Sequence, residues 1–235
     1  MIKLISNNSI YESLKANRVL KLFYSDSFGN QNILDLAKEK HIPLFKLTKN
    51  EFIKKYGFDN QGCVAIAKDY KLYSLGEIIE SSKNIENPII VILDELSDPH
   101  NLGAILRSCD VFGVSGVIFK KRNNVSLNQT VAATSSGAIN YVKCCEVANL
   151  SQSIEVLKKN NFWVVGLAGE AKDDLKSIPK DCSLAIVVGS EGYGISRLVR
   201  KNCDFMTKIP MKGHVSCLNA SVSCAIVLYE LSTRK

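Results

Sequence analysis

Three polar segments stand beside apolar runs and carry residue types that could do chemistry. Residues 98–113 read DPHNLGAILRSCDVFG and contain Asn101 and Arg107. Residues 187–196 read VVGSEGYGIS and place Glu191 among three glycines, which permit a tight turn and a close approach to a ligand. Residues 207–230 read TKIPMKGHVSCLNASVSCAIVLYE, with Asn219 at the start of an apolar helical pattern. Because the first turn of a helix has unpaired N–H groups, such junctions between strands and helices can hold a small ligand.

An alternation of strands and helices from Pro88 onward would position these segments. Residues 89–93 form a fully apolar run, which is typical of a buried parallel strand. Further strands are predicted at 116–119, 141–144, 163–167, 184–188 and 205–209, and helices at 101–112, 127–135, 151–160, 194–202 and 218–232. The pattern predicts an open α/β sheet. A dinucleotide site is disfavoured, because GSEGYG lacks the G-x-G-x-x-G spacing and comes late in the sheet.

The helix expected at 101–112 has one apolar stripe, formed by Leu102, Ile105, Leu106, Cys109 and Phe112. Arg107 lies off this stripe and should point away from the core. Asn101 stands where an N-cap residue is expected, and capping is its simplest interpretation.

The N-terminal third alternates helices and strands on a smaller scale, which predicts a small α/β domain over 1–68. Thr48 and Glu51 have the spacing of a capping box and predict the start of a helix. Residues 69–87 are polar and are interpreted as a linker with one helical turn near Ile78 and Ile79. Other elements are expected as a helix from Asn8, strands at 19–24, 44–47 and 63–67, and a helix at 32–40.

The composition is that of a globular protein, with 46% hydrophobic and 23% charged residues. No apolar run of membrane-spanning length and no secretory signal is found, so a cytoplasmic location is expected. The net charge is +7, and residues 1–68 hold 11 basic against 6 acidic residues, as a phosphate-binding surface would. The eight cysteines form no C-x-x-C pair and are expected to be reduced, without a metal site.

In this order and at these separations, the three segments resemble the three signature motifs of the SpoU (TrmH) family of RNA ribose methyltransferases. The resemblance covers residues 88–235 strongly and residues 1–70 weakly. It implies a parallel-sheet methyltransferase domain of the SPOUT type over 88–235, with a deep trefoil knot that periodicity alone would not suggest. It also implies that 1–68 is a small RNA substrate-binding domain.

The same resemblance assigns the site. It implies S-adenosylmethionine as cofactor and a ribose 2′-hydroxyl as methyl acceptor. Arg107 could act as a base or as an electrostatic stabiliser, and we favour the second role because a guanidinium is very hard to deprotonate. Many relatives have serine where this chain has Cys217, so a hydroxyl role there is in doubt. The implied catalytic residues are Asn101, Arg107, Glu191 and Asn219, and the implied cofactor-binding residues are Leu167, Gly189, Ile209, Met211 and Leu218.

The predicted function is methylation of a ribose in RNA, with a guanosine of 23S rRNA as the first candidate and tRNA as the second. The alternatives are a non-catalytic RNA-binding protein on the same fold and a nucleotide-dependent oxidoreductase. The C-terminal helix is apolar nearly all round, so one side should pack on its own sheet and the other in a homodimer. RNA is the other expected partner, and no membrane or metal is expected.

Overall fold

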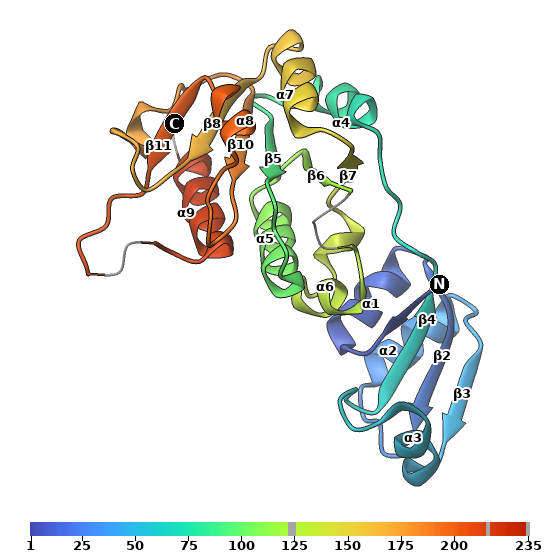
Figure 1. The fold of residues 1–235 in the computed structure, drawn as a ribbon. Helices are drawn as coiled ribbons and strands as arrows, with labels where there is room; N and C mark the ends of the chain where they lie inside the picture. The colour runs from blue at the N-terminus through green and yellow to red at the C-terminus, as the bar shows by residue number, and fades with distance from the viewer. Residues whose placement is uncertain (122–125, 215–216, 234–235) are drawn as a thin grey trace. The chain divides into compact units, whose positions relative to one another are not determined.

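A computed structural model of the chain describes residues 1–121, 126–214 and 217–233, which form two compact units. Unit 1 comprises Met1–Tyr70 and Leu127–Tyr141, and unit 2 comprises Lys71–Ser126 and Val142–Lys235. Each unit has its own sheet (Figure 1). This grouping differs from the expected ranges, because it assigns a segment from the middle of the chain to the N-terminal unit.

Unit 1 is built on a four-stranded sheet in the order β1-β4-β2-β3. β2 and β3 are parallel, whereas β4 runs antiparallel to both β1 and β2. The predicted capping box is confirmed, since Thr48 and Glu51 bond reciprocally at the start of α3. Strand β1 was not predicted, because three residues carry too little pattern. The elements are β1 (Ile2–Leu4), α1 (Asn7–Lys15), β2 (Val19–Ser25), α2 (Gln31–Glu39), β3 (Leu44–Leu47), α3 (Lys49–Tyr56) and β4 (Cys63–Ala67).

The inserted segment of unit 1 holds α6 (Gln129–Thr134) and the short 3-10 helix η1 (Ala138–Asn140), which pack against α1 and β1. Asn140 Oδ1 accepts hydrogen bonds from Arg18 Nη1 at 2.6 Å and Ser13 Oγ at 3.3 Å. Gly137 has a φ of +93°, and a Cβ there would lie 2.6 Å from Glu12 Cβ. The contact between these two parts of the chain is therefore close and specific.

Unit 2 contains a seven-stranded sheet in the order β7-β6-β5-β10-β8-β11-β9, with every pairing parallel. The parallel sheet expected from the βα alternation is confirmed. β7 begins three residues later than predicted, because Tyr141 ends η1 instead of starting the strand. The strands are β5 (Ile89–Leu93), β6 (Gly116–Lys120), β7 (Cys144–Val147), β8 (Trp163–Leu167), β9 (Asp173–Asp174), β10 (Leu184–Val188) and β11 (Phe205–Lys208).

The segment expected as a linker instead contributes a helix to the core of unit 2. Ile78 is fully buried and Ile79 is 7% exposed, and both pack in the central cluster with residues of β5, β6 and β10. A Cβ on Gly116 would lie 2.7 Å from the Ile78 side chain. The helices of unit 2 are α4 (Leu75–Ser82), α5 (Pro99–Val111), α7 (Leu150–Lys159), α8 (Arg197–Lys201), α9 (Ala220–Ser232) and the 3-10 helix η2 (Leu175–Ser177).

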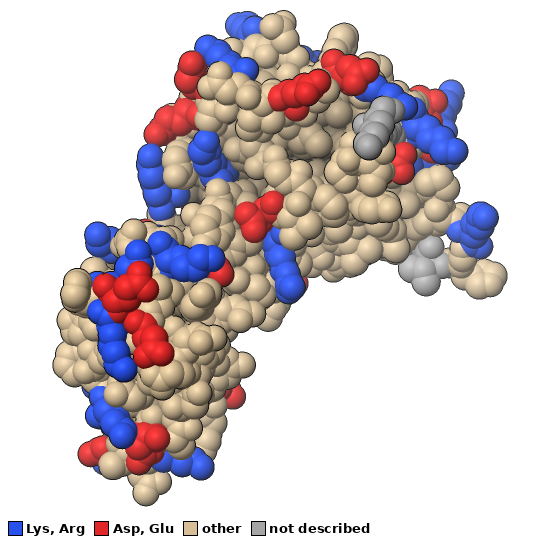
Figure 2. Space-filling view, turned by 180° about the vertical axis from the view of Figure 1, so that it is seen from behind, with Lys and Arg blue, Asp and Glu red and all other residues tan. Residues whose placement is uncertain are grey.

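Basic and acidic side chains are interspersed over the face drawn in Figure 2, with broad uncharged areas between them. None of the helices in the described part of the chain is long and apolar enough to cross a membrane.

Candidate functional site

The first polar segment, residues 98–113, contains α5 and its N-cap in unit 2. Asp98 is the N-cap of α5, with Oδ1 accepting from His100 N at 2.9 Å, and Pro99 occupies the first helical position. The interpretation of Asn101 as the cap is therefore wrong, because the helix begins two residues earlier. Asn101 is inside the first turn and only 6% exposed, so its amide is available for contacts with other elements.

Three predicted catalytic side chains meet directly although they come from separate parts of the chain. Asn101 Nδ2 donates to Glu191 Oε1 at 2.9 Å. Asn219 Nδ2 donates to the same oxygen at 2.6 Å and to Asn101 Oδ1 at 2.9 Å. The two amides therefore fix both the position of the carboxylate and their own orientation.

Asn219 also caps the helix that follows it. Its Oδ1 accepts from Ser221 N at 2.9 Å and Val222 N at 3.3 Å, and from the Ser221 hydroxyl. Helix α9 thus begins one residue after Asn219, and the start of this helix places the amide in the cluster. Residues 215 and 216 of the segment 207–230 lie outside the described residues.

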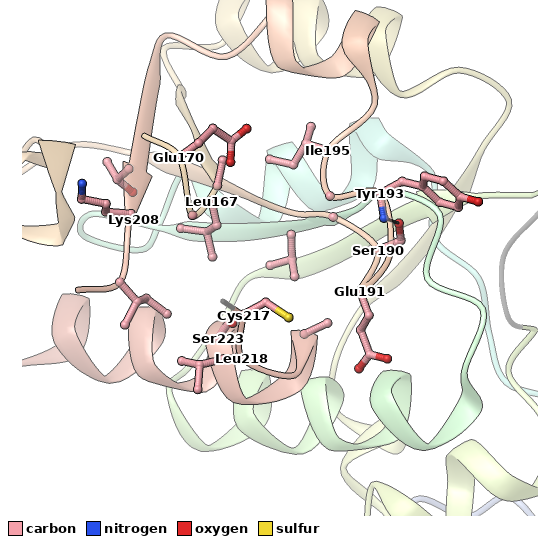
Figure 3. Close-up of a pocket in the computed structure, with 18 of the residues that line it drawn as sticks. Leu167, Glu170, Ser190, Glu191, Tyr193, Ile195, Lys208, Cys217, Leu218 and Ser223 are labelled. Atoms are coloured by element: carbon pink, nitrogen blue, oxygen red, sulfur yellow. Dashed lines mark hydrogen bonds between the residues drawn. The ribbon is translucent and has the colours of Figure 1, made fainter. Parts of the chain in front are cut away.

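The glycine-rich loop that carries Glu191 closes tightly after β10. Ser190 and Gly194 exchange backbone hydrogen bonds of 2.9 and 3.0 Å, and Gly194 has a φ of +65°. A Cβ on Gly189 would lie 2.2 Å from the carbonyl carbon of Gly194, a distance that real structures do not tolerate. The turn therefore requires glycine at 189, and it turns Glu191 toward α5 (Figure 3).

A cavity of about 590 Å³ adjoins this loop on the side of β8 and β11. All five residues predicted to bind the cofactor line it, as does Glu191. The loop after β8, the glycine loop, the segment after β11 and the start of α9 each supply part of the wall (Figure 3). The predicted residues in the lining are Leu167, Gly189, Ile209, Met211 and Leu218.

Several polar residues of the lining were not predicted, among them Glu170, Arg200, Thr207 and Lys208. Glu170 forms an ion pair with Arg200, and hydrogen bonds from its own backbone and then from Arg200 lower the pKa of the Glu170 carboxyl. Thr207 is fully buried, and none of the described residues gives its Oγ1 a hydrogen-bond partner. A buried hydroxyl of this kind favours a polar ligand in the cavity.

Arg107 is exposed on α5, as its position off the apolar stripe predicted. Leu102, Ile105, Leu106 and Cys109 of that stripe are buried. Arg107 follows Asn101 by six residues, which places it about 9 Å farther along the helix axis. The two residues therefore project from different turns of α5.

A buried carboxylate supports the same end of the sheet. Asp94 follows β5, is fully buried, and accepts from Ser196 N at 2.8 Å. Lys120 Nζ lies 3.3 Å from Asp94 Oδ1, at ion-pair distance but without hydrogen-bond geometry. Burial lowers the pKa of Lys120, but Asp94 and Glu95 outweigh it, so the pKa is raised overall. Asp94 thereby ties the segment that follows the glycine loop to β5 and β6.

All eight cysteines are free, and five of them are buried. Cys217 is exposed and lines the cavity. In the ranges that the structure describes, no three His, Cys, Asp or Glu side chains gather as a metal site.

Comparisons of this sequence with family models and with known proteins find matches over most or all of its length. Residues 88–229 match the family model described as SpoU rRNA Methylase family. A putative TrmH family tRNA/rRNA methyltransferase of Staphylococcus haemolyticus is 38% identical over 239 residues, covering 100% of this chain and 96% of the relative. The counterpart YacO of Bacillus subtilis is 37% identical, covering 98% of this chain and 95% of the relative.

Among solved structures, the AdoMet-bound rRNA methyltransferase of Sinorhizobium meliloti superposes with a TM-score of 0.80 at 20% identity. The superposition covers 98% of this chain and 86% of the chain in that structure. The likeness shows that the two chains share a fold.

Proposed function

The chain belongs to the SpoU rRNA methylase family, and from this premise we propose that it transfers a methyl group from S-adenosylmethionine to a ribose 2′-hydroxyl of RNA. The observation that carries the proposal is the contact among Asn101, Glu191 and Asn219 at the edge of a 590 Å³ cavity. A cofactor site and a cluster of oriented polar groups are the two parts that such a transfer needs.

The cavity suits S-adenosylmethionine in its chemistry as well as its place. Leu167, Ile209 and Leu218 offer apolar surface for an adenine ring, and the buried Thr207 hydroxyl offers an unused polar group. The cofactor would supply an activated methyl group, with S-adenosylhomocysteine as the leaving group, so the residues of this chain need only hold the two reactants together while the hydroxyl proton passes to solvent. The solved relative from Sinorhizobium meliloti is described with AdoMet bound, in agreement with this assignment.

We assign Arg107 to the RNA side of the reaction. A guanidinium is planar, stays charged and presents a fork of donors, so it can hold the ribose hydroxyl and a neighbouring phosphate together. It would stabilise the negative charge that develops on the oxygen as the methyl group is transferred. Glu191 holds the amides of Asn101 and Asn219 in place.

A guanosine of large-subunit rRNA is the substrate we propose, and tRNA is the alternative, because the relatives are described as tRNA/rRNA methyltransferases. Residues 1–68 would provide RNA affinity, in line with their excess of basic residues. The expected place of action is the cytoplasm, where these RNAs are found.

Two further assignments concern the C-terminal part of unit 2. We assign it the trefoil knot of the SPOUT type, which membership of the family implies. We also assign it a homodimer through α9, for the reasons given in the Discussion.

Replacing Arg107 tests the proposed reaction. Arg107→Ala should change the free energy of unfolding by no more than about 1 kcal/mol, because the side chain is exposed. Methyl transfer to rRNA in a single turnover should fall on the order of 100-fold, while calorimetric S-adenosylmethionine affinity stays unchanged. Arg107→Lys should restore little, since a point charge cannot replace the fork.

Arg197→Ala is the matched control, because Arg197 is an exposed arginine of α8 outside the cavity lining. Near-native transfer by Arg107→Ala would contradict the role of the guanidinium, and a parallel loss of cofactor affinity would move Arg107 into the cofactor site. Mapping 2′-O-methyl groups in rRNA and tRNA of a deletion strain then names the substrate.

A further inference from the structure

Two stacked phenylalanines lie on the sheet of unit 1, apart from the candidate site. Phe23 of β2 and Phe45 of β3 are register partners, and their ring centroids are 4.9 Å apart at an interplanar angle of 20°. β3 is an edge strand, with no further strand beside it in the described part of the chain. Phe45 is 45% exposed although it is a large apolar side chain. Phe45 is therefore the outer ring of the pair, on the edge strand of the sheet.

Two lysines lie beside this stack. Lys55 Nζ lies 4.9 Å from the Phe23 ring centroid and 5.4 Å from that of Tyr56, and Lys21 Nζ lies 5.7 Å from Phe23. Residues 44–56 read LFKLTKNEFIKKY, with four lysines against the single acidic residue Glu51. Glu51 is engaged with Thr48 in the capping box. Lys21 and Lys55 thus bring positive charge to the rings, and the neighbouring sequence adds little negative charge.

An exposed aromatic ring near lysines suits a nucleic-acid partner better than a protein partner. Sites for single-stranded nucleic acid combine aromatic rings, on which bases stack, with basic groups that follow the phosphates. The centres of protein interfaces are depleted in lysine, so the same surface is a poor protein docking site. Unpaired bases can also reach a half-exposed ring, whereas bases inside a helix cannot.

We infer that Phe45 and the lysines beside the stack form a stacking site for an unpaired base of the RNA, with Lys21 and Lys55 close enough to the rings to meet the flanking phosphates. This inference rests on the proposed function, because it assigns part of the substrate to unit 1. It concerns the binding of RNA by unit 1, and the methyl transfer remains assigned to unit 2.

The test compares full-length variants for binding of a fluorescein-labelled single-stranded RNA of about 12 nucleotides, followed by fluorescence anisotropy. Phe45→Ala should weaken binding about tenfold, the usual scale for one base stacked on one ring. Phe45→Tyr, which keeps the ring, should stay within about twofold of the native chain. Phe58→Ala is the matched control, because Phe58 is an 81% exposed phenylalanine of the same unit outside the stack, and its affinity should not change.

Native affinity in Phe45→Ala would overturn the stacking site, and so would an equal loss in Phe58→Ala. Methyl transfer separates this inference from the proposed function. If Phe45→Ala binds RNA normally and the native chain methylates rRNA, the stacking site is wrong and the function stands. If Phe45→Ala loses RNA binding but the native chain methylates no RNA, the stacking site stands and the function is wrong.

Discussion

At the scale of single residues, the two ends of the Asn219 amide make different contacts. Its oxygen caps α9, and its nitrogen donates to Glu191 and Asn101. A small hydroxyl residue can still cap the helix, but its side chain is too short to donate a hydrogen bond to Glu191 and Asn101. Substitution can therefore separate the stability of the helix from the geometry of the site.

Asn219→Ala should lower the free energy of unfolding by about 1 kcal/mol, whereas Asn219→Ser should keep most of it because serine is a good N-cap. Both variants should lose methyl transfer to a similar degree, on the order of 100-fold, because neither donates an amide hydrogen to Glu191. Urea unfolding and single-turnover transfer measure the two effects. A serine variant with native activity would show that the amide is needed only as a cap.

Cys217 should be the first thiol to react in the native protein. It is exposed in the cavity lining, whereas burial raises the pKa of Cys63, Cys144 and Cys203 to about 12. At pH 8 those three thiols hold almost no thiolate, so they react slowly. Modification by Ellman's reagent should show one fast phase that Cys217→Ser removes and S-adenosylhomocysteine slows. A fast phase indifferent to that ligand would place the cofactor elsewhere.

At the scale of elements, the glycine loop after β10 offers a sharp contrast between two neighbouring glycines. A Cβ on Gly189 would collide with the Gly194 backbone, whereas a Cβ on Gly192 would meet nothing within 4 Å. Gly189→Ala should therefore open the turn and lower calorimetric cofactor affinity at least about tenfold, since overpacking costs typically 1–3 kcal/mol. Gly192→Ala should bind the cofactor like the native chain. Equal affinities would mean that the loop adapts without loss.

The sequence predicted elements well where one pattern dominated. The apolar runs at 163–167 and 184–188 became β8 and β10 with the expected bounds. Helix α4 was underestimated, although Ser74 and Glu77 form a capping box that marks its start. The capping role was wrongly given to Asn101, because Pro99 and Asp98 define the earlier start of α5.

The candidate site was predictable only through the family motifs. Asn101, Glu191 and Asn219 belong to three separate elements, and periodicity within each element says nothing about contacts between them. Thr207 and Glu170 were missed because a strand residue and a loop acid carry no local signal of the cavity between them. Tertiary packing supplies that information, since the parallel strand order brings β8, β10 and β11 side by side.

At the scale of the whole molecule, α9 presents apolar surface that its own unit does not cover. Its buried residues are Ala220, Cys224, Val227 and Leu228, and they include neither Val222 nor Tyr229, which are 45% and 60% exposed. An apolar face of this kind favours a second protein surface.

We predict a homodimer with an interface of roughly 2,000 Å² or more. Light scattering at micromolar concentration should give twice the chain mass of 25.9 kDa. The double variant Val222→Lys, Tyr229→Lys should shift the protein toward the monomer, because it places charges in the apolar contact. Leu198→Lys, at a 68% exposed position of α8, is the control and should remain dimeric. A native chain that scatters as a monomer would contradict the prediction.

The segment 127–141 also bears on how the protein is made. A ribosome releases residues 1–70 first, but α6 and η1, which pack against α1 and β1, are not yet synthesised. At the usual 5–20 residues per second, the interval before Asn140 emerges is roughly 4 to 14 seconds. During that interval, Arg18 and Ser13 lack Asn140 as a hydrogen-bond acceptor. The nascent N-terminal unit therefore completes its packing only after more than half of the chain has been translated.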